Sequence, residues 1–165
     1  MNTKRIALVS ILLTLALIIG IIESLIPPLI PIFPYIRVGF SNIIVLYTLI
    51  TMQVKDAYLV AILKSIFVGI FVGNPIMILY SLPSSVISLS IAYLIISFKK
   101  NSLPAISAIS AIAHNITQLV VAALIMQTLL VLSYVPYFIL IGSISGFGVG
   151  CIVYLLLKKM PKFTI

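Results

Sequence analysis

Acidic side chains are almost absent from this chain. Its 165 residues include two carboxylates, Glu23 and Asp56, against ten lysines and arginines, and charged residues of both signs make up only 7% of the total. A soluble domain carries about a quarter charged residues. Two carboxylates, one histidine and one cysteine supply neither an aspartate-rich magnesium site nor the ligand set of a zinc site. We therefore expect no metal and no cofactor.

Two further absences narrow the class of protein. The sequence has no glycine-rich phosphate loop followed by lysine and serine or threonine, so the chain is not expected to hydrolyse ATP by itself. It also has no continuous basic patch, although its net charge is +8. The cations stand in short groups at the ends of apolar runs, as membrane topology signals do. We expect no enzymatic activity of the chain's own and no nucleic-acid partner.

Hydrophobic residues are abundant. They make up 63% of the chain, and the mean hydropathy is +1.38. This composition predicts an all-α, polytopic protein of the lipid bilayer, in a single domain over residues 1–165. The apolar runs between charged or proline-rich turns predict six transmembrane helices, over residues 6–26, 38–53, 56–72, 76–98, 103–132 and 137–157.

The distribution of cations predicts the orientation of these helices. Six spans place eight cations on one face of the membrane: Lys4, Arg5, Lys55, Lys99, Lys100, Lys158, Lys159 and Lys162. Only Arg37 falls on the other face, and Lys64 lies within the third span. The positive-inside rule then places both termini in the cytoplasm, for a multi-pass protein of the plasma membrane.

The only histidine lies near the middle of the fifth predicted span. His114 is 11 residues beyond Leu103, about 16 Å along a helix, in a hydrocarbon layer roughly 30 Å thick. Asn115 and Gln118 lie within one turn, and spacings of three and four predict that all three side chains share one flank. Polar groups at this depth need a partner, a cavity or a ligand. We predict a binding site here, with a hydrogen bond between helices as the alternative.

Other polar residues are expected to surround this group. Lys64 lies eight residues after Asp56, roughly 12 Å into the third span, and is expected to point inward rather than to reach the surface. Four more polar residues lie toward the predicted outer face: Glu23, Arg37, Asn42 and Asn74. Together these residues predict an outward-opening pocket with the 27–36 loop as a lid. An ion pair between Glu23 and Arg37 at the interface is the alternative for those two.

Three glycines recur at four-residue spacing in the sixth predicted span, at Gly142, Gly146 and Gly150. Such spacing makes a smooth groove for the close approach of another helix. Packing within the six-helix bundle is favoured over docking of a second subunit.

Four segments carry a resemblance to a known family. They are Ile22–Pro27, Ile36–Asn42, Leu63-Lys64 and, most specifically, Ala113–Gln118. In these segments the chain resembles the Gx transporter family, regarded as substrate-binding S components of energy-coupling factor transporters and also labelled heptaprenyl diphosphate synthase component I. Lys64 stands where arginine is expected and Thr117 where glycine is expected. The first change keeps the positive charge but weakens bidentate anion binding.

The resemblance implies a function and its partners. S components are six-helix proteins that bind a small solute and dock onto a transmembrane T subunit, which two cytoplasmic ATPases drive. The docking contact is expected on the first span, here at Ser10 and Thr14. The cations and the histidine suggest a small anionic or polar solute. Two alternatives stay open: an accessory membrane protein of prenyl diphosphate metabolism, and a structural membrane scaffold.

Overall fold

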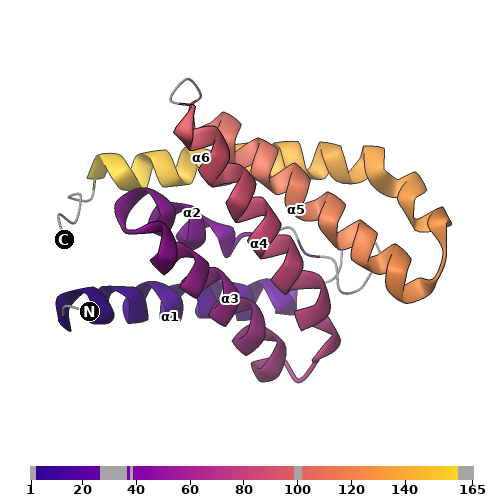
Figure 1. Cartoon of the computed structure of the whole chain (residues 1–165), viewed down its shortest axis with the longest axis horizontal. Helices are drawn as coiled ribbons and strands as arrows, with labels where there is room; N and C mark the ends of the chain where they lie inside the picture. Colours follow the sequence, from indigo (N-terminus) through magenta and orange to yellow (C-terminus); the bar gives the residue numbers. More distant parts are fainter. Residues whose placement is uncertain (1–2, 27–36, 38, 99–101, 160–165) are drawn as a thin grey trace.

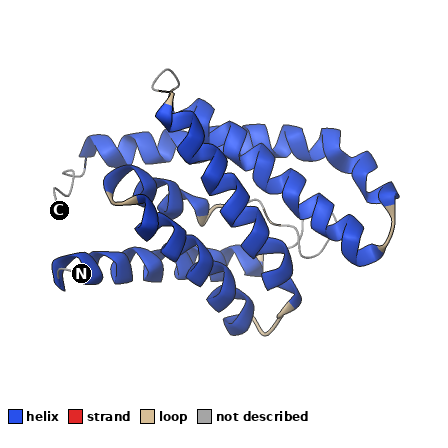
Figure 2. Cartoon of the chain, in the orientation of Figure 1, coloured by secondary structure: helices blue, strands red, loops and turns tan. Residues whose placement is uncertain are grey.

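The computed structural model describes residues 3–26, 37, 39–98 and 102–159. As the sequence predicts, this part of the chain is helical and contains no strand (Figure 2). The 3-10 helix η1 (Leu129–Tyr134) connects the last two α-helices. The α-helices are α1 (Thr3–Leu25), α2 (Asn42–Thr51), α3 (Val54–Phe71), α4 (Ile76–Ser97), α5 (Leu103–Met126) and α6 (Val135–Lys159).

The short helix α2 forms the centre of the bundle. It contacts α1, α3, α4 and α6 and is buried continuously from Ile44 to Leu49, as expected for a helix that is apolar on every side. Around it, α3 packs on α1 and α4, α4 on α5, and α5 on α6. The start of α1 and the end of α6 lie at the same end of the molecule (Figure 1).

Four helical segments are long and apolar enough to cross a membrane: α1, α4, α5, and η1 together with α6. Their outward faces carry large exposed apolar side chains, such as Ile11, Leu124 and Ile144, which lipid accommodates and water does not. The other two helices differ. With ten residues, α2 is about 15 Å long, and α3 carries three charged residues in its 18. The chain is therefore a helical membrane protein.

The helices differ from the predicted spans at two places. The second helix covers residues 42–51 rather than 38–53, because Gly39, with a φ of 88°, cannot belong to a right-handed helix. The fifth ends at Met126 rather than at residue 132, because Gln127 adopts the left-handed conformation, with a φ of 52°, that ends many helices. The proposed lid, residues 27–36, lies outside the described residues.

Helix α6 packs closely on α5 along its glycines. A Cβ atom on Gly146 would lie 2.6 Å from Ala111 Cβ and 2.7 Å from the Ser107 carbonyl oxygen. A Cβ atom on Gly150 would lie 2.5 Å from Pro104 Cα, and one on Gly142 would lie 3.1 Å from the backbone of α5. The contacts at Gly146 and Gly150 are too short for a side chain and the one at Gly142 is tight, so these positions permit close packing inside the bundle.

An ion pair joins α1 to α3 at the end of the molecule where α1 begins. Arg5 Nε and Nη2 donate three hydrogen bonds of 2.8–3.1 Å to the Asp56 carboxylate. Asp56 also accepts the Gln53 N–H, in a capping box that begins α3. This is the one ion pair found in the described part of the chain.

Candidate functional site

A cavity of about 30 Å³ lies among α1, α3, α4 and α5, near the end of α1 opposite to the Arg5–Asp56 pair. We call it the charged cavity. The structure brings five of the predicted site residues to its wall: Glu23, Arg37, Lys64, His114 and Gln118. All of them except Arg37 are buried, with 8% exposure or less.

Lys64 points into the protein and not toward the membrane surface. Its Nζ donates to Ser41 Oγ at 3.0 Å and to Asn42 Oδ1 at 2.6 Å. Both acceptors are neutral, and the described residues place no carboxylate in an ion pair with this ammonium. Because the Glu23 carboxylate lines the same cavity but forms no ion pair with Lys64, this buried charge is only partly compensated.

Glu23 and Arg37 also lie at the charged cavity but use other partners. Glu23 Oε1 accepts the Gly39 N–H, while Arg37 donates to the Gly20 carbonyl oxygen at 3.2 Å and contacts Met77 Sδ. The described atoms thus form no direct Glu23–Arg37 ion pair, the alternative that the sequence left open. Burial lowers the pKa of Arg37 and the nearby Glu23 carboxylate raises it, but an arginine stays protonated in proteins. Two cations therefore face one carboxylate.

His114 and Gln118 bring unpaired acceptors to the charged cavity. Among the described residues, His114 Nδ1 and Gln118 Oε1 find no hydrogen-bond partner, although the two residues are only 3% and 1% exposed. An unpaired buried polar atom costs about 1–3 kcal/mol. A guest with suitable donors would remove that cost.

Three of the predicted site residues do not line the charged cavity: Asn42, which contacts Lys64 from outside it, Asn74 and Asn115. Asn115 Nδ2 donates to the Phe138 carbonyl oxygen of α6 at 3.2 Å, so this side chain belongs to the α5–α6 contact. Asn74 lies in the turn between α3 and α4, where its backbone N–H donates to the Gly69 carbonyl oxygen. Neither residue lines the charged cavity.

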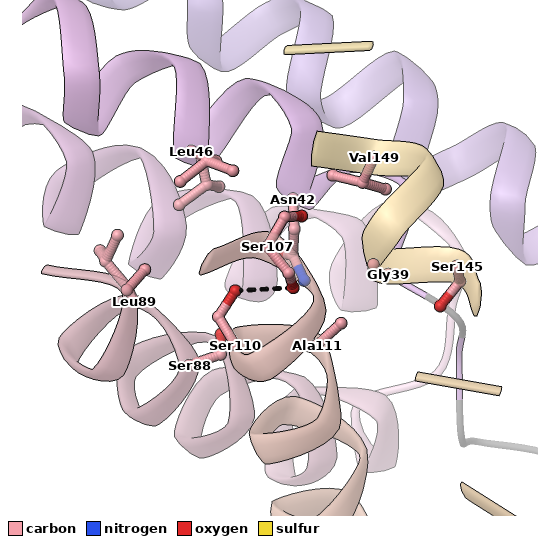
Figure 3. Close-up of a pocket in the computed structure, with 13 residues that line it drawn as sticks. Gly39, Asn42, Leu46, Ser88, Leu89, Ser107, Ser110, Ala111, Ser145 and Val149 are labelled. Carbon is pink, nitrogen blue, oxygen red and sulfur yellow. Dashed lines mark hydrogen bonds between the residues drawn. The ribbon is translucent and has the colours of Figure 1, made fainter. Parts of the chain in front are cut away.

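A second cavity, also of about 30 Å³, lies among α2, α4, α5 and α6 (Figure 3). Its wall combines apolar side chains with four serines: Ser88, Ser107, Ser110 and Ser145. The Ser110 hydroxyl donates to the Ser107 carbonyl oxygen at 3.0 Å, so the proton of this hydroxyl already has an acceptor within the protein. Gly39 borders both cavities, and Asn42 lines the second while binding Lys64. The segment from Gly39 to Asn42 therefore separates the two cavities.

Sequence reasoning missed Ser41 as a partner of Lys64 and Gly39 as the partner of Glu23. Both residues precede Asn42 within four residues at the start of an apolar helix, and that position was the available signal. A serine at a helix start is more often a cap, but Ser41 makes no capping hydrogen bond with its side chain here.

These features define the class: a helical membrane protein with a buried cavity in which cations outnumber carboxylates and acceptors lack donors. The chain belongs to the family described as heptaprenyl diphosphate synthase component I, which matches residues 12–156. The match includes every residue that lines the charged cavity and confirms the heptaprenyl diphosphate synthase component I label to which the four sequence segments pointed. Comparison of the chain with curated proteins and with solved structures found no match.

Proposed function

We propose that this protein is the solute-binding membrane subunit, or S component, of an energy-coupling factor importer, and that the charged cavity holds a small anionic solute. The observation that carries the proposal is Lys64, buried to 4% exposure with two neutral oxygens as its hydrogen-bond partners. A lysine near the middle of a membrane costs about 2.5–3.5 kcal/mol on insertion scales. A bound anion offsets that cost.

The charge around Lys64 favours an anion over other solutes. The cavity wall holds two cations, Lys64 and Arg37, and one carboxylate, Glu23. Its formal charge is therefore +1. Because electrostatic attraction is stronger in a poorly hydrated site, an incoming anion gains from both cations and is opposed by one carboxylate.

Solute binding requires the charged cavity to open. Its volume of about 30 Å³ is far below the roughly 300 Å³ of a small ligand pocket. Arg37 and Met77 are the residues best suited to move, because both are only partly buried and Arg37 is held by a carbonyl oxygen and a thioether. Methionine side chains adapt readily to a changed packing partner. We expect both side chains to turn aside as the solute enters.

The topology and the partners complete the proposal. All six helices cross or line the membrane part of the protein, with the start of α1 and the end of α6 on the cytoplasmic side of the plasma membrane. On α1, Ser10 and Thr14 are exposed, and Thr14 Oγ1 donates to the Ser10 carbonyl oxygen. Small side chains, with the threonine hydroxyl already hydrogen-bonded within the helix, allow another helix to approach closely. The T subunit would dock there, with two cytoplasmic ATPases supplying energy.

A second candidate function follows from the family description, which names a prenyl diphosphate synthase component. The excess of cations in the charged cavity also suits a diphosphate group. In that case the protein would assist a catalytic partner, and magnesium-dependent prenyl transfer by that partner would stop when this protein is removed. A structural scaffold, the third class, would bind no solute at all.

The test compares Lys64→Met with Lys55→Met, a matched change at an exposed position of the same helix. Mass spectrometry of the protein from native membranes identifies the co-purified solute, and equilibrium dialysis with that compound measures its affinity. We expect Lys64→Met to be as stable as the unmodified protein and to bind at least about tenfold more weakly, the scale of a lost charged contact. Lys55→Met should change neither. The proposal fails if Lys64→Met unfolds or leaves the affinity unchanged.

A further inference from the structure

The unpaired acceptors of the charged cavity restrict the chemistry of its guest. Lys64 and Arg37 offer N–H donors and positive charge, whereas His114 Nδ1 and Gln118 Oε1 offer lone pairs that no hydrogen bond from the described residues uses. A neutral imidazole has a proton on one ring nitrogen and a lone pair on the other, so His114 Nδ1 serves as an acceptor in the tautomer that carries the proton on Nε2. A guest that matches this wall must be an anion that also donates hydrogen bonds.

Common anions differ in this respect. A carboxylate or a sulfate at neutral pH carries acceptors only, so it would leave His114 and Gln118 unpaired. An ammonium group supplies donors, but it would stand beside two cations. A hydrogen phosphate group carries negative charge and at least one O–H donor in a group of few atoms. From these contacts we infer that the charged cavity selects a protonated phosphate, either free or as the end of a phosphate monoester. This inference rests on the proposed function and specifies its solute.

The geometry of α5 supports this assignment. His114 and Gln118 are four residues apart, so their side chains lie one above the other on a single helix face, and both line the charged cavity. Asn115, between them in sequence, also has an unpaired oxygen, Oδ1. Its amide is held by Phe138 of α6, away from the cavity lining. Helix α5 therefore supplies two acceptors that line the cavity, and Asn115 serves as a control residue outside the cavity lining.

The experiment uses phosphate and sulfate, which have the same tetrahedral shape and similar size. The full chain in lipid nanodiscs is titrated with each anion at pH 6, and binding is followed by calorimetry and by the rise in unfolding temperature. Sulfate carries more negative charge at this pH, so charge alone favours sulfate. We expect phosphate to bind at least about tenfold more tightly, the scale of one hydrogen bond to a charged group. Methyl phosphate, compared with inorganic phosphate, distinguishes a monoester from the free ion.

Variants locate the selectivity. Gln118→Met should reduce the preference for phosphate to about threefold or less, whereas Asn115→Leu should leave it unchanged in whatever fraction folds. Equal binding of the two anions by the unmodified protein, or no binding of phosphate, methyl phosphate or sulfate, overturns the inference, and water then accounts for the unpaired acceptors. The proposed function fails separately, when Lys64→Met leaves the binding of the co-purified solute unchanged.

Discussion

Asp56 and Glu23 are the two carboxylates of the chain, and their surroundings differ. Asp56 receives three hydrogen bonds from Arg5 and a fourth from the Gln53 backbone. Glu23, near the other end of α1, receives the Gly39 N–H. The two cations beside it, Arg37 and Lys64, are bound to neutral atoms instead. The Asp56 carboxylate is therefore fully paired with a cation, whereas Glu23 and the two cations beside it form no ion pair among the described residues.

This difference separates a structural role from a binding role. The Arg5–Asp56 pair joins two helices and has little to gain from a further partner, because its charges and most of its hydrogen bonds are already matched. The group around Glu23 keeps an excess positive charge and two unpaired acceptors in the same cavity. Such incompleteness persists in a folded protein when the remaining structure holds it in place, and it is common at functional sites.

The largest effect should come from breaking the complete pair. Asp56→Asn leaves Arg5, whose side chain is 18% exposed, without its counter-ion and weakens the cap of α3. We expect the free energy of unfolding to fall by about 2–4 kcal/mol, toward the range for breaking a buried ion pair. Thermal unfolding in detergent measures this change. Solute affinity per folded molecule should stay the same, because Asp56 lies outside the charged cavity.

Exchanging the two charges tests the cause. The double variant Arg5→Asp, Asp56→Arg should recover part of the lost stability, although the capping box will not re-form. If Asp56→Asn instead weakens solute binding while the protein stays folded, the two ends of α1 are coupled and the separation of roles is incorrect.

A smaller effect is expected at Gly39, which borders both cavities. Its φ is 88°, and a Cβ atom there would lie 2.8 Å from Asn42 Nδ2. Gly39→Ala should therefore lower stability by about 1–2 kcal/mol through backbone strain. It should also push Asn42 away from Lys64 and weaken solute binding by about three- to tenfold.

Gly73→Ala provides the matched control for this change. Gly73 has a similar φ of 73°, but a Cβ atom there would meet no atom within 4 Å. The strain should be comparable and the solute affinity unchanged. Equal losses of affinity in the two variants would mean that general destabilisation, and not the position of Asn42, controls binding.

Much of the helical architecture was predictable, because twenty-residue apolar runs have few other solutions in a membrane protein. Their ends were less predictable. Gln127 ends α5 in a left-handed conformation that non-glycine residues seldom adopt, and no residue pattern signals it. The shortness of α2 depends on the positive φ of Gly39, which a glycine permits but does not require.

The sequence predicted those site residues whose role follows from their depth within a membrane-spanning helix. Lys64, His114 and Gln118 stand far from the ends of their helices, and the structure gathers them at one cavity. Spacing also placed Asn115 with them, but neighbouring residues on a helix point about 100° apart. The rotation of α5 against α6, set by close packing at Gly142 and Gly146, turns Asn115 toward Phe138. That rotation is a tertiary property and is not encoded in local spacing.

The smallest expected effect comes from neutralising the carboxylate of the charged cavity. Glu23→Gln keeps an oxygen that can accept the Gly39 N–H but removes one negative charge, so the cavity changes from one excess positive charge to two. For an anionic solute the carboxylate is a competitor for Lys64 and Arg37. We therefore expect the solute to bind about three- to fivefold more tightly, a gain of less than about 1 kcal/mol, as measured by equilibrium dialysis.

The direction of this change is more informative than its size. Without a solute, Glu23→Gln leaves two cations with less compensation, so the empty protein should be slightly less stable while the bound protein gains affinity. Opposite changes in stability and affinity are difficult to produce by general damage to the fold, which lowers both. Glu23→Asp, which keeps the charge on a shorter side chain, controls for the lost negative charge. A fall in affinity for Glu23→Gln, with Glu23→Asp unchanged, would show that this carboxylate attracts the solute, and its assignment as a competitor for Lys64 and Arg37 would then be wrong.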